Sequence, residues 1–481
     1  MKSPVAYLSV AVVAVLVSGG CMKLGPDYHR PDTGIQVPAS YQHGPRDMVI
    51  LGAEDQWWDV FGKPELSQLV EEALRKNLDI KKATARILEV RSQLVQTRAD
   101  RFPSLHIDGT AERRQRPVIG IVPGKSFSTK TDTYTLSLPA SFELDLWGRL
   151  ARSEEAARTD LLQAEENRRT VAQSVVAETI SLYLQVESLE RRIQIALASI
   201  ENFRRSLALV ESRYKRGLTS VLDVYQARRI LAGAEALLPS LREELGITQQ
   251  RLSVLLGRYP KAQPARPQPE EYFKHLAPVP PGLPSDLLLR RPDIRAAEAN
   301  LMALNARIGV AQASRFPSMT LTGSYGFSSE ELHQLVRRES KLWHLASGIG
   351  QTLFDAGKLK AGQRTAEARY QQGVAEYAKT VLTAFSEVES VLLTRERQLE
   401  RRDRQLKFLL EARATQDVAE KRYRRGLVDY LTVLEAQRTR FEAEESLVLV
   451  DLVILTNRVA LHRALGGGWG ELPPAVARTE S

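Results

Sequence analysis

The sequence predicts a mainly α-helical protein that is complete only as an oligomeric tube, with strands at one end and very long helices at the other. This prediction depends on an internal duplication, on segments with strict two-residue alternation, and on helical stretches far longer than those of globular domains. The chain has 481 residues, of which 43% are hydrophobic and 26% are charged. This composition excludes an intrinsically disordered chain and a bundle of membrane helices.

The first residues form a predicted targeting segment. Lys2 precedes a short apolar stretch at 5–17, and the small residues 18–20 lead directly to Cys21, the only cysteine of the chain. This order is typical of a secretory signal and not of a membrane span. A single cysteine at the cleavage point predicts a bacterial lipoprotein acylated at Cys21, although Ser18 stands where the usual motif has leucine. Ordinary signal cleavage beside an unmodified cysteine is the alternative.

The charge of the chain is positive but diffuse. The 67 lysines and arginines outnumber the 58 acidic residues, which gives a net charge of +9. Basic and acidic residues alternate along the helical stretches, as is typical of solvated helix faces and not of a nucleic-acid-binding surface. One cysteine and seven scattered histidines predict no metal site, and the sequence has no nucleophile–base set or phosphate-binding loop. We therefore expect no enzymatic activity, no cofactor and no nucleic-acid partner.

The chain repeats itself at an offset of 209 to 214 residues. Segments 213–238 and 422–447 are identical at twelve of 26 positions, and Arg-Phe-Pro-Ser occurs at 101–104 and again at 315–318. Such repeats indicate two copies of one structural unit. The drop in offset between these blocks predicts a shorter loop in the second copy. The predicted boundaries are a signal peptide 1–20, a lipid-anchored N-terminal segment 21–64, a first repeat 65–258, a linker 259–284, a second repeat 285–466 and a C-terminal tail 467–481.

Each repeat contains a pair of predicted strands. Apolar and polar residues alternate between about 103 and 145 and between about 317 and 355, which predicts strands with one apolar and one polar face. Strands of a transmembrane barrel and of a soluble sandwich share this pattern. Aromatic residues of these regions are candidates for an interfacial belt or for packing inside a barrel: Phe102, Phe316, Tyr325, Phe327 and Trp343.

The helical stretches favour the membrane alternative. Residues 149–216 contain neither glycine nor proline, and 68 helical residues form a rod of about 100 Å. Apolar residues between 182 and 214 keep a 4-3 spacing, which is typical of coiled coils. Gly217 and Gly426 end two such rods, and further helices are predicted over 220–256 and 429–465. Because transmembrane barrels have at least eight strands, four strands per chain require several chains to pool them.

Several motifs occur in a characteristic order along the chain. They are Gly-Pro-Asp-Tyr at 25–28, Trp-Trp at 57–58, Asn-Leu-Asp at 77–79, Leu-Gly-Arg-Tyr-Pro at 256–260 and Leu-Arg-Arg-Pro-Asp-Ile-Arg-Ala-Ala-Glu at 289–298. With these motifs the chain resembles the outer membrane factor (TolC-like) family, in its efflux lipoprotein branch. The resemblance implies a trimeric TolC-like α/β-barrel channel, in which each chain supplies four β-strands to a shared 12-stranded outer-membrane barrel and long coiled-coil helices to a periplasmic α-barrel.

The resemblance also implies a function and partners. The chain is expected to be the outer-membrane channel of a tripartite efflux system, anchored in outer-membrane lipid and extending into the periplasm. It would passively conduct drugs or other small toxic compounds from an inner-membrane pump of the resistance-nodulation-division type and a periplasmic adaptor protein to the exterior. A type I protein-secretion duct has the same fold and is the alternative. A periplasmic coiled-coil tether would explain the rods but not the paired strands.

The functional residues implied by the resemblance lie at the two glycine turns, which form the periplasmic mouth. Tyr423 is implied to tie neighbouring hairpins shut, and Glu435 to be an inward-facing acid of the aperture. Thr432 stands where the family has a second acid, so Asp429 is the candidate for the missing charge; solvated helix-end residues are the alternative for both acids. The residues implied to contact the adaptor are Arg216, Gly217, Leu218, Arg425, Gly426 and Leu427.

Overall fold

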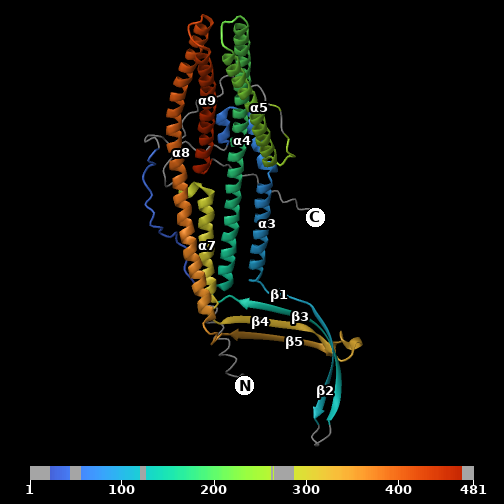
Figure 1. Ribbon diagram of the computed structural model, residues 1–481. Coiled ribbons are helices and arrows are strands. Elements are labelled where there is room, and N and C mark those ends of the chain that lie inside the picture. Colours follow the sequence, from blue (N-terminus) through green and yellow to red (C-terminus); the bar gives the residue numbers. More distant parts are fainter. Residues whose placement is uncertain (1–21, 44–55, 120–125, 262–263, 265–286, 468–481) are drawn as a thin grey trace. The chain divides into compact units, whose positions relative to one another are not determined.

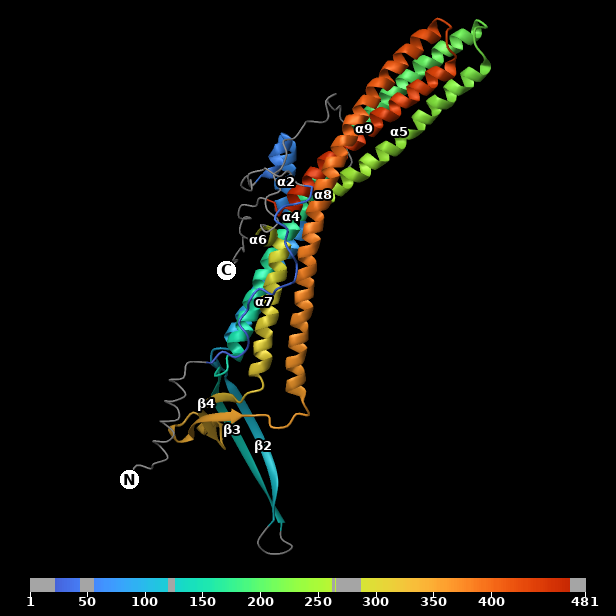
Figure 2. The ribbon, with the colours of Figure 1, turned by 90° about the vertical axis from the view of Figure 1, so that its left-hand side faces the viewer.

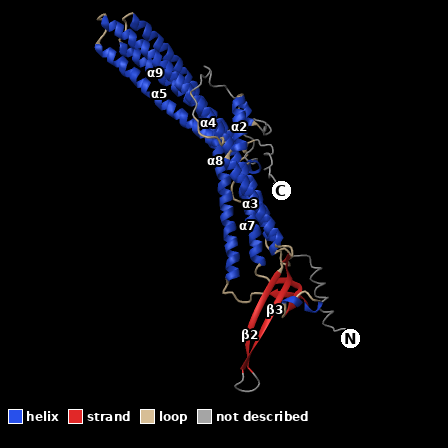
Figure 3. Ribbon diagram, turned by 90° about the vertical axis from the view of Figure 1, so that its right-hand side faces the viewer, coloured by secondary structure: helices blue, strands red, loops and turns tan. Residues whose placement is uncertain are grey.

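The computed structural model describes residues 22–43, 56–119, 126–261, 264 and 287–467. In these ranges the chain forms helices and one antiparallel sheet (Figures 1 and 3). It divides into two compact units, each assembled from three chain segments. The sheet unit comprises 1–33, 86–165 and 296–378, and the hairpin unit comprises 34–85, 166–295 and 379–481.

In both halves of the chain, helices precede and follow a strand region, and the short elements differ between the two halves. The first half has η1 (Trp57–Phe61), α2 (Pro64–Lys76), α3 (Leu78–Ala99), β1 (Ser104–Leu105), β2 (Asp108–Ile119), β3 (Ser126–Leu144), α4 (Arg149–Lys215) and α5 (Val221–Leu255). The second half has α6 (Leu287–Arg290), α7 (Pro292–Ala313), β4 (Ser318–Ser329), η3 (Leu332–Gln334), η4 (Arg338–Ser340), β5 (Lys341–Gly350), α8 (Lys358–Arg424) and α9 (Tyr430–Ala464). The three longest pairs of corresponding helices have equal lengths: 22 residues in α3 and α7, 67 in α4 and α8, and 35 in α5 and α9.

The sheet is four strands wide. Its strands pair in the order β1, β3, β4, β5, and β2 also pairs with β3. Ser104 of β1 faces Ser141 of β3, and Asp108 of β2 faces Ser137, so β1 and β2 follow the same edge of β3. Between them the amide of His106 still donates to the carbonyl oxygen of Pro139 at 3.0 Å. The two segments therefore act as one interrupted strand.

The prediction of a shorter loop in the second copy is wrong. β5 has 10 residues whereas β3 has 19, so it is the strand that is shorter. Segment 330–340 between β4 and β5 is longer than segment 120–125 between β2 and β3. Alternation predicts both strands but does not show where each one ends, so the sequence alone does not reveal that the difference in length lies in the strands.

Both long helices begin after an aspartate that caps them. Asp145 accepts a hydrogen bond from the amide of Ala151 at 2.8 Å, and Asp355 accepts one from the amide of Leu359 at 2.8 Å. Carboxylates in this position satisfy amides that have no partner inside the helix. In both copies an aspartate thus caps the helix that follows, with a donor amide six residues on at Asp145 and four residues on at Asp355.

The hairpin unit contains two antiparallel helix hairpins, α4 with α5 and α8 with α9, which lie side by side (Figures 1 and 2). Trp57, Trp58 and Phe61 of η1 are buried against α4 and α9. This burial accounts for the Trp-Trp motif as a packing anchor, because large aromatic side chains contribute much of the apolar area that a helical core removes from water.

The Leu-Arg-Arg-Pro-Asp-Ile-Arg motif also has a structural role in the hairpin unit. Arg291 is buried, and its guanidinium pairs with Asp293 at 2.6 Å and with Glu387 of α8 at 2.8 Å. It also donates to the carbonyl oxygen of Ala464 at the end of α9, at 3.0 Å. One side chain therefore connects the start of α7 to α8 and α9. A buried charge is tolerated when its donors are matched in this way.

Candidate functional site at the hairpin tips and the sheet face

Both long helices end in the same glycine turn. Gly217 has a φ of 72° and Gly426 a φ of 74°. In each turn the amide of the following leucine donates to the carbonyl oxygen five residues earlier, at 3.0 Å. This is the Schellman end of a helix, for which a residue with positive φ is needed and glycine is favoured. The predicted ends of the two rods are therefore confirmed.

The six residues predicted to contact an adaptor all lie exposed at these two turns. They are Arg216, Gly217, Leu218, Arg425, Gly426 and Leu427. Leu218 and Leu427 expose most of their apolar side chains. Arg216 donates to the carbonyl oxygen of Ser212 at 3.2 Å, so its position is set by the last turn of α4. Contact with an adaptor stays a prediction.

The helices that follow the two turns begin with different caps. At the start of α5, Ser220 and Asp223 form a capping box, in which the amide of Leu222 donates to Ser220 Oγ at 3.1 Å. At the start of α9, Asp429 Oδ1 accepts hydrogen bonds from the amide of Thr432 at 2.9 Å and from its hydroxyl at 2.6 Å. These hydrogen bonds lower the pKa of Asp429. Asp429 is therefore an anionic helix cap.

Tyr423 lies buried between the two hairpins of the chain. The guanidinium carbon of Arg213, on α4, is 4.8 Å from the centroid of the Tyr423 ring, and Arg213 Nη1 is 3.4 Å from the Tyr423 carbonyl oxygen. The Tyr430 ring centroid is 5.4 Å away, and the Tyr430 hydroxyl is 3.1 Å from Ser206 Oγ on α4. Burial raises the pKa of both tyrosines, that of Tyr430 to about 12. Two tyrosines of the second hairpin thus contact the first.

A groove of about 510 Å³ lies between α8 and α9 beside the second turn. Asp429, Thr432 and Glu435, the three residues that the sequence analysis assigned to the aperture, all line it. Phe408 and Glu411 of α8 line it as well. Sequence reasoning missed these two residues because they lie 15 or more positions before Gly426, and only packing of α8 on α9 brings them to the groove.

Glu435 is exposed and has a basic neighbour on its own helix. Its Oε1 lies 3.0 Å from Arg438 Nη2, one helical turn further along α9. Exposed pairs of this kind contribute little to stability, and water and salt screen them. The carboxylate is therefore accessible from solvent, but Arg438 offsets part of its field.

The strands bring apolar side chains into register on one face of the sheet. Leu138 of β3 pairs with Tyr325 of β4, which pairs with Trp343 of β5. All three are exposed, Trp343 by 75%. The next row on the same face contains Ala140, Gly323 and Leu345. A contiguous apolar surface of this kind marks contact with lipid or with another protein chain.

Both outer edges of the sheet are open within the described residues. β2 and β1 pair only with β3, and β5 pairs only with β4. An open edge presents a row of backbone donors and acceptors to another strand. None of the described helices is both long enough and apolar enough to span a membrane. The predicted acylation site, Cys21, lies outside the described residues.

Comparison with known proteins identifies the family. A model of the family described as "Outer membrane efflux protein" matches residues 69–258 and again residues 283–467. The chain is 33% identical over 470 residues to the cation efflux system protein CusC of Escherichia coli O6:H1 strain CFT073, covering 97% of this chain and 99% of CusC. It is 32% identical over 472 residues to the probable outer membrane lipoprotein SilC of Salmonella typhimurium, covering 96% and 99%.

The fold agrees with this identification. The solved structure of the outer-membrane channel OprN superposes with a TM-score of 0.85 at 32% sequence identity, covering 93% of this chain and 99% of that one. The fold is therefore TolC-like, and the resemblance inferred from the sequence motifs is confirmed. The chain belongs to the outer membrane efflux protein family and is an outer-membrane channel protein of an efflux system.

Proposed function

We propose that three copies of this chain assemble into one channel that passively conducts drugs or other small toxic compounds out of the cell. Each copy contributes its four-strand-wide sheet to a shared 12-stranded barrel in the outer membrane and its two helix hairpins to a periplasmic tunnel. A periplasmic adaptor and an inner-membrane pump of the resistance-nodulation-division type supply the substrate and the energy. The proposal contains no catalytic step and no cofactor.

The observation that carries this proposal is the sheet, whose apolar face is exposed and whose two edges are both open. An isolated sheet of this width in water would aggregate through its edges, whereas a closed ring of sheets has none. In lipid every backbone polar group needs a partner, which only closed barrels and helices provide. Edge pairing of β5 of one copy with β2 of the next satisfies both requirements.

The gate is proposed to lie at the second hairpin turn. Asp429 and Glu435 border one groove near this turn, and three copies around a common axis would form a ring of carboxylates that attracts cations and repels anions. Tyr423 would hold the mouth closed, because it joins the second hairpin to the first through Arg213. The exposed leucines and arginines of the two turns are proposed to contact the adaptor.

The amino terminus is proposed to be anchored by acylation of Cys21. The order of charged start, apolar stretch and small residues before the only cysteine supports this, as does the printed description of SilC as a lipoprotein. Several buried acyl chains would anchor this end firmly, since each buried methylene contributes about 0.8 kcal/mol.

The test is assembly and conductance of the full-length protein. We expect the detergent-solubilised protein to have the mass of a trimer by light scattering and to form ion-conducting pores in planar bilayers. A stable monomer that leaves bilayers electrically silent would contradict the proposal. Deletion strains screened with antibiotics, solvents and metal ions separate efflux from protein secretion, because only efflux predicts increased sensitivity to small toxic compounds.

A further inference from the structure

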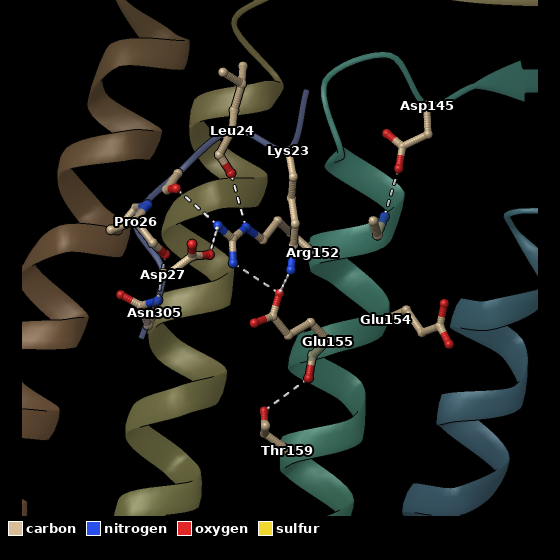
Figure 4. A network of polar contacts seen from close by, with 12 residues as sticks. Lys23, Leu24, Pro26, Asp27, Asp145, Arg152, Glu154, Glu155, Thr159 and Asn305 are labelled. Atoms are coloured by element: carbon tan, nitrogen blue, oxygen red, sulfur yellow. Dashed lines mark hydrogen bonds and ion pairs between the residues drawn. The ribbon is translucent and has the colours of Figure 1, made fainter. Parts of the chain in front are cut away.

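The segment directly after Cys21 is docked onto helices α4 and α7 of the sheet unit (Figure 4). We call residues 22–30 the N-terminal strap. At its start the amide of Leu24 donates to the carbonyl oxygen of Trp147 at 3.1 Å. Asn305 of α7 donates to the carbonyl oxygen of Pro26 at 2.8 Å. The backbone of the strap is thus hydrogen-bonded to Trp147, shortly before α4, on one side and to α7 on the other.

Arg152, in the first turn of α4, is the centre of these contacts (Figure 4). Its side chain is 1% exposed. Nε donates to the carbonyl oxygen of Leu24 at 3.0 Å, and Nη2 donates to that of Gly25 at 2.9 Å and to Asp27 Oδ1 at 3.0 Å. Nη1 donates to Glu155 Oε2 at 3.0 Å. One buried guanidinium therefore holds three residues of the strap, using the fork of donors that only arginine has.

The strap fits a cradle that has no room for extra atoms. Gly25 has a φ of 94°, and a Cβ built on it would lie 2.4 Å from the Cα of Gly309 on α7. A Cβ on Gly309 would in turn lie 2.9 Å from the carbonyl oxygen of Leu24. A Cβ on Gly148 would lie 2.9 Å from the Cα of Lys23. These three close approaches show that the backbone of the strap fits tightly against Gly148 and Gly309, and we call this binding site the seat of the strap.

A second attachment secures the far end of the strap. Arg30 forms two hydrogen bonds with Glu298 of α7, Nε to Oε1 at 2.8 Å and Nη2 to Oε2 at 2.6 Å. Paired bonds of this kind between arginine and carboxylate are strong and fix orientation. The strap is therefore attached at both ends, and the Arg152 contacts are at the end nearer to Cys21, where Lys23 also pairs with Glu155 at 2.5 Å.

The seat lies where the sheet passes into helix. Trp147, which accepts the hydrogen bond from Leu24, stands between the end of β3 and the start of α4. Its indole donates to the carbonyl oxygen of Pro317 at 2.7 Å, and its ring centroid is 5.0 Å from that of Phe316. Aromatic residues at the end of membrane strands are typical of the lipid–water interface.

We propose that Arg152 is a positioning residue for the lipid anchor, in that it docks the strap and so makes acylated Cys21 enter the bilayer beside the Trp147 junction. Three residues of chain span at most about 11 Å, which confines Cys21 to the neighbourhood of the Leu24–Trp147 hydrogen bond. This inference rests on the proposed acylation. With a free strap the anchor would remain in the membrane, but the start of α4 would no longer hold it at a defined place.

The first test measures docking by proteolysis with a lysine-specific protease in the full-length protein. Cleavage between Lys23 and Leu24 requires the strap to leave its seat, because docked backbone does not fit a protease cleft. We expect Arg152→Met and Gly25→Val to accelerate this cleavage at least about tenfold, since each breaks the seat from a different side. Gly25→Val alters only the strap, so it keeps the test valid even if Arg152→Met impairs folding.

The controls separate docking from general stability. Arg158→Met removes an exposed α4 arginine whose partner is Glu154, and it should leave the Lys23–Leu24 cleavage rate unchanged. Cleavage after Lys215 at the hairpin tip provides an internal reference rate that none of these variants should alter. Equal cleavage rates at Lys23 in the wild type, Arg152→Met and Gly25→Val would overturn the proposal.

The second test locates the anchor itself. A photocrosslinking amino acid replaces the exposed Met22, next to Cys21, in protein reconstituted into liposomes. We expect the wild type to crosslink to its own junction peptides, and Arg152→Met to lose most of these products. Unchanged crosslinks would refute the positioning role. Mass spectrometry of the N-terminal peptide reports acylation separately, so an unmodified Cys21 would contradict the lipid anchor without affecting the docking result.

Discussion

The two helix hairpins share one backbone design but bury different parts of it. Their long helices have the same length, as do their return helices, and both turns have a glycine with positive φ. The first residue of the return helix is Val221 in one hairpin and Tyr430 in the other, and these side chains are 46% and 1% exposed. Tyr430 packs on the first hairpin, whereas Val221 is half-exposed, and burial in α5 begins with Val224.

This difference shows which properties a duplication preserves. Helix length and turn geometry depend on the glycine and on the absence of helix breakers, and both are retained in the two copies. Burial depends on single side chains, and these have diverged. The second hairpin therefore carries the packed tyrosines and the acidic groove, whereas the first supplies the surface on which they rest.

The largest expected effect comes from Tyr430→Ala. Truncating a fully buried aromatic side chain removes about 3 kcal/mol or more of local stability. The matched change in the other copy, Val221→Ala, affects a half-exposed residue and should stay within about 0.5 kcal/mol. Hydrogen exchange of the amides in the first turns of α9 and α5 measures both. Similar losses in the two hairpins would refute the comparison.

A smaller and symmetric effect is expected at the turns. Gly217→Val and Gly426→Val should each cost about 1–2 kcal/mol, because a side chain disfavours the left-handed conformation. No atom lies within 4 Å of the Cβ position at either glycine, so conformation alone sets the cost. Gly233→Ala, inside α5 and also in open space, is the control and should stabilise. Clearly unequal costs at the two turns would show that their environments differ after all.

The cap of α9 should depend on the side-chain oxygen of Asp429 and not on its charge alone. Asp429→Ala should fray α9 because the Thr432 amide loses its acceptor, whereas Asp429→Asn should retain the cap. The hydrogen bonds from Thr432 lower the pKa of Asp429 from its ordinary value of 3.8. The part of the stabilisation that depends on the charge is therefore complete above pH 3.8 and is lost as pH falls through the lower pKa of the folded state. Fraying of α9 followed by exchange against pH checks this, and loss of the cap well above pH 4 would contradict it.

The smallest expected effect is on ion selectivity. Asp429→Asn combined with Glu435→Gln removes both carboxylates from the groove and retains their shape, so cation preference should fall at least about twofold. Reversal potentials across a salt gradient in planar bilayers measure the change. Glu411→Gln, in the same groove on α8, tests whether that unpredicted acid contributes. Unchanged selectivity in the double variant would remove both residues from the aperture.

Much of the fold was predictable because it depends on local signals. The predicted rod of 149–216 differs from α4 by one residue. Gly148 and Gly217 flank this stretch, which contains no glycine or proline. The apolar face of the sheet followed from two-residue alternation. The lengths of the strands could not be predicted, because no residue type in the sequence marks where the alternating segments stop pairing.

The parts of the site that depend on distant packing were not predictable. Phe408 and Asp429 line one groove only because α8 and α9 pack together at that level. The contacts of Arg152 connect residues more than 120 positions apart in the chain. In the sequence it is one arginine among many, with nothing in its neighbours to mark it.

The equal lengths of the paired helices restrict how the gene can change. Inserting one helical turn into α4 alone would carry its tip about 5.4 Å beyond that of α8. The buried tyrosine contacts between the hairpins would then lose their register. Insertions and deletions are therefore tolerated in these helices only when the other copy gains or loses the same number of residues, so both halves of the gene must change in length together.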